Sequence, residues 1–192
     1  MFLVFPRVRL RVSVFALPSL LCMLWLEGAL PFLMLIASAM LHESGHLLAM
    51  RSVGSVARRV DILPMGALIV CPEGLSYRDE AVIALSGPMF SLAASFIAFC
   101  IYALSKNVYL FFFGFINLFL AVFNLLPVKR SDGGKALFCL LMQRNIENAD
   151  RICSFASIAS RLTVLTLASV SIALSGYNLG VILLLFALLL QL

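Results

Sequence analysis

The chain has 192 residues, of which 63% are hydrophobic and 12% charged, with 14 Lys and Arg against 9 Asp and Glu. Soluble domains carry roughly 45–50% apolar and about 25% charged residues, so this composition excludes an ordinary soluble domain or a disordered chain. The surplus of apolar residues is expected to face lipid. The net charge of +5 is then explained by membrane topology, and no nucleic-acid partner is expected. The five cysteines are scattered, which argues against a disulfide framework.

The N-terminal half predicts a strand, two spans and a second β region. Residues 7–15 alternate Arg with apolar side chains, which is typical of a short strand at the membrane surface; an ordinary basic flank of the first span fits equally well. A short span is expected at 15–26 and a second at 29–50, whose end reads HESGH. A β-like stretch interrupted by proline and glycine follows at 60–70.

The C-terminal half predicts four further spans around a polar connection. A spanning helix takes about 20 residues, and the apolar runs that approach this length lie at 81–104, 108–126, 155–174 and 177–192. The connection from 127 to about 151 has room for a short helix. With no linker and no repeat, residues 1–192 form a single domain. The expected fold is an all-α polytopic membrane protein with about six transmembrane helices and a small membrane-associated β-hairpin or sheet.

Basic residues orient the bundle. Three precede the first span, four lie between spans two and three, and five lie between spans four and five, so twelve of the 14 share one side. The positive-inside rule makes that side cytoplasmic. Lys106 alone falls on the opposite side, and Arg161 lies within span five. We expect a multi-pass protein of the cell membrane with both termini in the cytoplasm.

The end of the second span carries the sequence His42-Glu43-Ser44-Gly45-His46, an HExxH match that contains both histidines of the chain. Positions i and i+4 of a helix share a face about 6 Å apart, so both imidazoles can bind one ion while Glu43 polarises a water. A bare HExxH also arises by chance. Inside an apolar span, however, each ionisable group costs roughly 2.5–3.5 kcal/mol, and a bound metal offsets that cost. The motif therefore predicts Zn²⁺.

A catalytic zinc site needs a third protein ligand and one open position. No third histidine exists, so a carboxylate must serve. Asp132 follows the fourth span, where Pro127 ends the helix and Gly133-Gly134 permits a tight path back towards the site. A plain surface turn is the alternative interpretation of this segment. The remaining acids are expected in solvent-facing connections or on the opposite side of the membrane: Glu27, Asp61, Glu73, Asp79, Glu80, Glu147 and Asp150.

The order of these motifs resembles a known family. HExxH in the second span, then the N-x-x-P of 124–127 and then DGG, is similar to the site-2 protease family of intramembrane zinc metalloproteases. The similarity is closest to the short sporulation-type members (stage IV sporulation protein FB-like), which have no PDZ domain. It implies that His42, His46 and Asp132 ligate zinc and that Glu43 is the general base. It also implies that Asn124 contacts the substrate or the reacting carbonyl.

A weaker similarity concerns substrate binding. The stretch Pro64–Ala67 resembles the family's membrane-embedded hairpin, and residues 66–71 could pair with an extended substrate strand. Gly66, Ala67 and Leu68 are therefore candidate substrate-binding residues, as is Asn124. A hairpin that only anchors the loop is an equally good interpretation.

Two features depart from the family pattern. Lys129-Arg130-Ser131 precedes the DG, where the family often has apolar residues and a second proline. In span three, Ser86-Gly87-Pro88 resembles a family element that commonly ends in Asn, but this chain has Ser91 there. These departures concern local geometry more than the identity of the ligands.

The resemblance implies hydrolysis of a peptide bond within or beside a membrane segment of a protein substrate. In the sporulation-type members that substrate is a pro-sigma factor, and an anti-sigma factor is a related candidate; a bacterial membrane is expected. A divalent-cation transporter is the main alternative, but the far half of the membrane offers only Glu27 and Lys106. An inactive relative would lack a ligand or the base. A prenyl-protein type protease would need Glu147 as its third ligand. Pairing with a second copy or a regulatory membrane partner is left open.

Overall fold

The computed structural model describes residues 9–12, 24–25, 28–56, 59–63, 66–70 and 74–175. The predicted first span at 15–26, apart from residues 24 and 25, and the predicted sixth span at 177–192 lie outside this part. The elements of the described part are β1 (Arg9–Val12), α2 (Ala29–Ser52), β2 (Arg59–Leu63), β3 (Gly66–Val70), α3 (Tyr77–Ser105), α4 (Val108–Leu125), α5 (Asp132–Gln143) and α6 (Ala149–Ser175).

Helices α2, α3 and α4 are long and apolar enough to cross a membrane. Such helices satisfy every backbone hydrogen bond within one segment, as a lipid environment requires. They lie within a few residues of the spans predicted at 29–50, 81–104 and 108–126. This part of the chain is thus mostly helical, with three candidate membrane spans, in agreement with the predicted fold. The count of six spans, and α6 as the fifth span predicted at 155–174, stay predictions.

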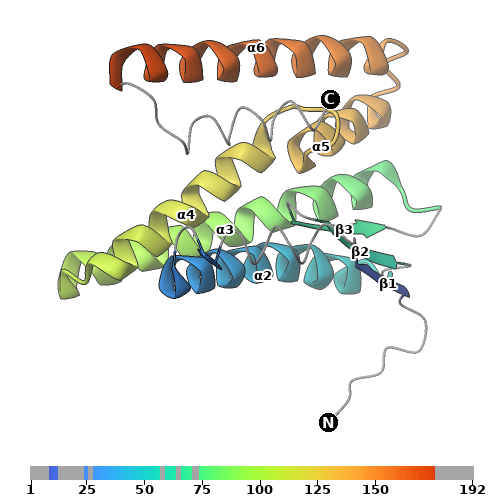
Figure 1. Cartoon of the computed structure of the whole chain (residues 1–192). Helices are drawn as coiled ribbons and strands as arrows, with labels where there is room; N and C mark the ends of the chain where they lie inside the picture. Colours follow the sequence, from blue (N-terminus) through green and yellow to red (C-terminus); the bar gives the residue numbers. More distant parts are fainter. Residues whose placement is uncertain are drawn as a thin grey trace.

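Helix α3 is the centre of the helical arrangement. It packs against α2, α4 and α5, while α6 contacts α5 and extends along the outer side of the molecule (Figure 1). The first turn of α3 is capped by Ser76, whose hydroxyl accepts from the backbone N–H of Asp79. Because α3 contacts both the helix with the HExxH motif and the helix that begins with DGG, it can align the two.

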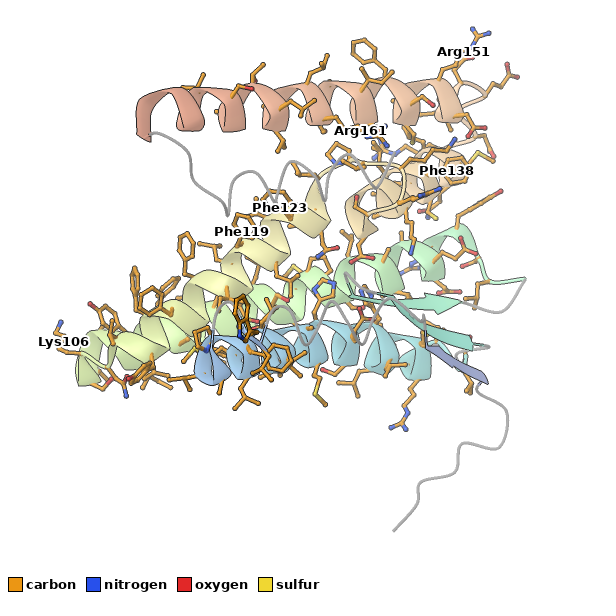
Figure 2. The ribbon with its side chains drawn as sticks, in the orientation of Figure 1. Lys106, Phe119, Phe123, Phe138, Arg151 and Arg161 are labelled. Atoms are coloured by element: carbon orange, nitrogen blue, oxygen red, sulfur yellow. The ribbon has the colours of Figure 1, made fainter. Side chains whose placement is uncertain are left out.

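The interior of the bundle is built mostly from small and polar side chains, with Met50 and Ile83 as buried exceptions, and most large apolar side chains point outward. Ser38, Ser91 and Asn117 are fully buried. In contrast, Met40 is 68% exposed and Phe96 is 70% exposed, and Figure 2 shows many such side chains on the outer surface of the helices. Small interior residues let membrane helices approach closely, while the large residues face lipid.

A buried polar contact joins α4 to α2. The side-chain amide of Asn117 donates to the hydroxyl of Ser38 (2.8 Å) and to the carbonyl of Phe113 in its own helix (2.9 Å). Ser38 in turn donates to the carbonyl of Met34. Ser38 lies one helical turn before His42, so this contact fixes α4 against α2 close to the HExxH motif.

The three strands form one sheet in the order β1-β2-β3 (Figure 1). Strand β1 is parallel to β2, and β2 is antiparallel to β3, with Leu63 opposite Gly66. Strand β1 falls within the stretch predicted at 7–15, whereas β2 and β3 together cover the stretch predicted at 60–70 except for positions 64 and 65 and begin one residue before it. Pro64 and Met65, which belong to the predicted hairpin, lie outside the described residues. Among the described strands β3 pairs with β2 alone and forms an edge of the sheet.

Candidate metal centre

The two histidines of the HExxH motif lie on the buried face of α2. His42 is 4% exposed and His46 is 7% exposed. Their Nε2 atoms are 3.3 Å apart, as expected for side chains four residues apart on one helical face. The helix thus presents a pair of imidazole nitrogens towards the interior of the bundle.

Asp132, far along the chain, meets this pair. Its Oδ2 lies 3.0 Å from Nε2 of His42 and 3.2 Å from Nε2 of His46. Burial opposes ionisation of this carboxyl, but the two imidazoles beside it hold the pKa of Asp132 well below its usual range. The structure therefore brings together the three residues that the sequence singled out as ligands.

The local path to Asp132 differs from the expected tight turn. Asp132 is the first residue of α5, and the two glycines after it belong to the first helical turn. A Cβ on Gly133 would overlap the backbone oxygen of Leu125, and one on Gly134 would overlap that of Val128. The glycines are needed here for close backbone approach rather than for an unusual turn conformation, and this corrects the sequence-based expectation.

Ser131 caps α5 and ties it to the end of α4. Its hydroxyl accepts from the backbone N–H of Gly134 (3.1 Å) and lies within donating reach of the carbonyls of Leu126 and Val128. A serine before the first helical residue is a common N-cap. From the sequence, Ser131 stood out only as part of a departure from a family pattern, although a serine directly before an acidic first turn was a signal for its role.

The other ring nitrogen of each histidine contacts α3. Nδ1 of His46 donates to the carbonyl oxygen of Ile83 (2.8 Å), and Nδ1 of His42 lies 3.0 Å from the hydroxyl oxygen of Ser91. A Cβ on Gly87, between these two positions, would overlap the imidazole of His46. Sequence reasoning had no signal for the carbonyl of Ile83, because any residue type offers one.

The arrangement of the two Nε2 atoms and the Asp132 carboxylate is better explained by a bound metal ion than by hydrogen bonds among the three side chains. All three lie within 4.8 Å of one another. When the His46 ring is neutral, donation from Nδ1 to a carbonyl leaves a lone pair on Nε2, and this lone pair faces the carboxylate of Asp132. Facing lone pairs repel unless a cation lies between them. Two histidines and one carboxylate are also a donor set of catalytic zinc sites. The residues therefore fit a divalent metal ion.

Glu43 lies beside this cluster without belonging to it. Its side chain is half-buried, and its charge interacts with those of His42, His46 and Asp132 and with Lys135 on α5. On the helix it is rotated by about 100° from His42. This places a carboxylate next to the candidate metal ligands.

The remaining predicted site residues do not belong to the cluster of candidate metal ligands. Asn124 lies near the end of α4 and is partly buried, and its amide nitrogen donates to the carbonyl of Leu120 in its own helix (2.9 Å). This bond occupies one of the two N–H groups of the amide. Gly66, Ala67 and Leu68 form the first part of β3.

Comparisons with known proteins agree with this geometry. Residues 104–170 match the profile of Peptidase family M50. A zinc metalloprotease of Methanocaldococcus jannaschii is 27% identical over 121 residues, which are 60% of this chain and 35% of that protein. Stage IV sporulation protein FB of Bacillus subtilis is 29% identical over 133 residues, 63% of this chain and 46% of that protein.

A solved structure shares the fold. The site-2 protease from Methanocaldococcus jannaschii matches with a TM-score of 0.70 at 20% identity, covering 98% of this chain and 90% of that chain. The chain spans less than half of the length of the curated relatives it matches. Together these findings confirm the resemblance to the site-2 protease family that the sequence motifs gave.

Proposed function

From this resemblance we propose that the chain is an intramembrane zinc metalloprotease. It hydrolyses a peptide bond within or next to a membrane segment of a protein substrate. The observation that carries the proposal is the convergence of His42, His46 and Asp132, whose donor atoms come from two different helices and face one another inside an apolar bundle. A buried cluster of this kind is costly in a membrane unless it binds an ion.

Each residue of the cluster has a role in this mechanism. His42, His46 and Asp132 hold the zinc ion, as the names of the relatives and the donor set support. When bound, zinc supplies Lewis-acid chemistry that polarises a water and the scissile carbonyl. Glu43 accepts the proton of the attacking water and then donates it to the leaving amine. Asn124 uses the second N–H of its amide to donate to the developing oxyanion.

Substrate binding in this proposal uses the edge of the sheet. A helical substrate hides its peptide bonds in hydrogen bonds, so the segment to be cleaved must unwind first. Strand β3 is an outer strand among those described, and its backbone at Gly66–Val70 can pair with an extended segment. Gly66, Ala67 and Leu68 are the residues proposed for this contact.

The proposed topology places the site near the cytoplasmic side of a multi-pass protein. Figure 2 shows Lys106 at the turn between α3 and α4 and Arg151 at the opposite end of the molecule. This separation supports the charge asymmetry seen in the sequence. We propose a bacterial cell-membrane location with cytoplasmic termini. The similarity to a sporulation protein supports regulated cleavage of a membrane-tethered transcription regulator, such as a pro-sigma or anti-sigma factor.

The test uses the purified full chain with a membrane-tethered peptide substrate and measures cleavage and bound zinc in parallel. Glu43→Gln is expected to retain zinc while cleavage falls by about 10²–10⁴-fold, since it removes the general base alone. Cleavage at the wild-type rate by this variant would contradict the mechanism. Asp132→Ala is expected to lose zinc as well as activity.

A matched control separates this proposal from the alternative third ligand. Glu147 is exposed and lies outside the cluster, so Glu147→Gln should leave zinc content and cleavage unchanged. Loss of zinc in this variant would instead favour the prenyl-protein type of site. Zinc transport by the wild-type chain in sealed vesicles, without peptide cleavage, would favour the transporter.

A further inference from the structure

Helix α3 faces the two histidines with a stripe of three residues four positions apart, Ile83, Gly87 and Ser91. Residues at this spacing share one side of a helix. The stripe meets His46 at its first two positions and His42 at its last. Numbers rise along α3 as they fall along α2, so the two helices are antiparallel here and each imidazole has its own contact on α3.

His46 receives its orientation from the backbone. The carbonyl oxygen of Ile83 accepts from Nδ1 at 2.8 Å, and a carbonyl can only accept. This contact holds the Nε2 atom towards Asp132 whatever side chain occupies position 83. Gly87 leaves the space in which the ring lies.

His42 receives its orientation from a side chain instead. From this contact we infer that Ser91 is a positioning residue that aims Nε2 of His42 at the metal ion; the inference rests on the proposed zinc site. When Nε2 of His42 binds a cation, Nδ1 carries the ring proton and needs an acceptor. The hydroxyl oxygen of Ser91, 3.0 Å away, is that acceptor. The hydroxyl is fully buried, so solvent cannot replace it.

The type of acceptor fits its surroundings. Metal-bound histidines often donate to a carboxylate, but a carboxylate at this depth would add another costly charge to a membrane-spanning helix. A serine hydroxyl accepts the hydrogen bond without a charge. Ser95 is the matched comparison, because it is also a buried serine of α3 (3% exposed). It lies four residues, about one helical turn, beyond Ser91, the position that contacts His42.

The test measures metal affinity of the full chain in detergent or nanodiscs without any substrate. Zn²⁺ affinity is determined by competition with a chelating dye, and the ligand geometry by the visible absorption of the Co²⁺-loaded protein. Ser91→Ala is expected to weaken Zn²⁺ binding by about 10–100-fold, the usual effect of losing such an outer partner, and to change the Co²⁺ spectrum. Ser95→Ala should leave affinity and spectrum unchanged. Ser91→Thr, which keeps the hydroxyl, should restore most of the affinity.

Three results would overturn the inference. The first is wild-type Zn²⁺ affinity and an unchanged Co²⁺ spectrum in Ser91→Ala. The second is an equal loss in Ser95→Ala, and the third is a loss in Ser91→Thr as large as in Ser91→Ala; both would show that packing, not the hydroxyl, controls the site. Since no substrate enters this experiment, a chain that binds zinc as described but cleaves no peptide would refute the protease proposal and leave the role of Ser91 standing.

Discussion

The two halves of the candidate metal centre are built by different means. His42 and His46 lie on one uninterrupted helix, α2, and the Nδ1 atom of each ring contacts α3. Asp132 is held by a chain connection, in which a capping serine and two glycines bring the start of α5 against the end of α4. The first half depends on helix periodicity, and the second depends on close packing of backbone atoms.

This difference determines how each half fails when it is altered. The backbone of α2 is held by helical hydrogen bonds before and after the two histidines. A substitution at the imidazole half should therefore change side-chain positions and leave the backbone in place. In the connection between α4 and α5 the backbone atoms are already in contact. A larger residue there must displace the start of α5, and Asp132 moves with it. Substitutions in each half can break or sharpen this contrast.

The largest effect is expected for Gly87→Ala, which acts on the imidazole half. The new methyl group would overlap the ring of His46, and the ring must rotate away from its metal-binding position. Zinc affinity should fall by more than about 100-fold, or about 3 kcal/mol, while the thermal stability of the metal-free protein stays close to wild type. Titration with zinc and thermal unfolding followed by circular dichroism measure the two quantities.

Gly114→Ala is the control for this variant. Its methyl group would come within 2.9 Å of the Phe99 ring, so it also crowds a helix contact, but it lies away from the metal ligands. It should leave zinc affinity unchanged. If Gly87→Ala binds zinc like wild type, the ring of His46 is not held as described.

Gly134→Ala should have the next largest effect, at the carboxylate half. Its methyl group would overlap a backbone oxygen, that of Val128, so α5 must shift relative to the end of α4. Crowding of this kind costs about 1–3 kcal/mol. We expect both a lower unfolding temperature and a 10–100-fold loss of zinc affinity. Leu140→Ala, at an exposed position of α5, should change neither; a Gly134→Ala protein of wild-type stability would contradict the close approach.

Ser131→Ala is expected to have the smallest effect. It removes the N-cap of α5 but adds no atoms, and loss of such a cap typically costs about 1 kcal/mol. Zinc affinity should fall by about fivefold, measured by the same titration. Ser131→Asp, which keeps a capping oxygen, should restore the affinity. No rescue by aspartate would mean that the hydroxyl acts through its contacts with α4 rather than as a cap.

The same contrast explains what the sequence could predict. The imidazole pair was evident because the i, i+4 spacing of HExxH alone determines that His42 and His46 share a face. Helices α2, α3 and α4 were equally evident, since long apolar runs between polar connections have few other conformations in lipid. A β-like stretch interrupted by proline and glycine was expected at 60–70, and strands β2 and β3 lie at 59–63 and 66–70.

Other parts of the site depend on tertiary contacts that no local pattern encodes. Asp132 could be proposed by elimination and by family resemblance, but its place at the start of a helix follows from backbone contacts between α4 and α5. The contact of Ser91 with His42 depends on how α2 and α3 cross. The pairing of Asn117 with Ser38 likewise joins positions 79 residues apart.

The inverted interior of the bundle has a consequence for mutational mapping. Where the central positions are occupied by alanine, or by serine away from the metal ligands, truncation to alanine removes a hydroxyl at most and leaves almost no void, so a conventional alanine scan would report little about packing there. Enlargement is the informative perturbation, because one added methyl group has nowhere to go. A scan with valine or leucine along the inward sides of α2, α3 and α4 would therefore identify the positions at which these helices contact one another.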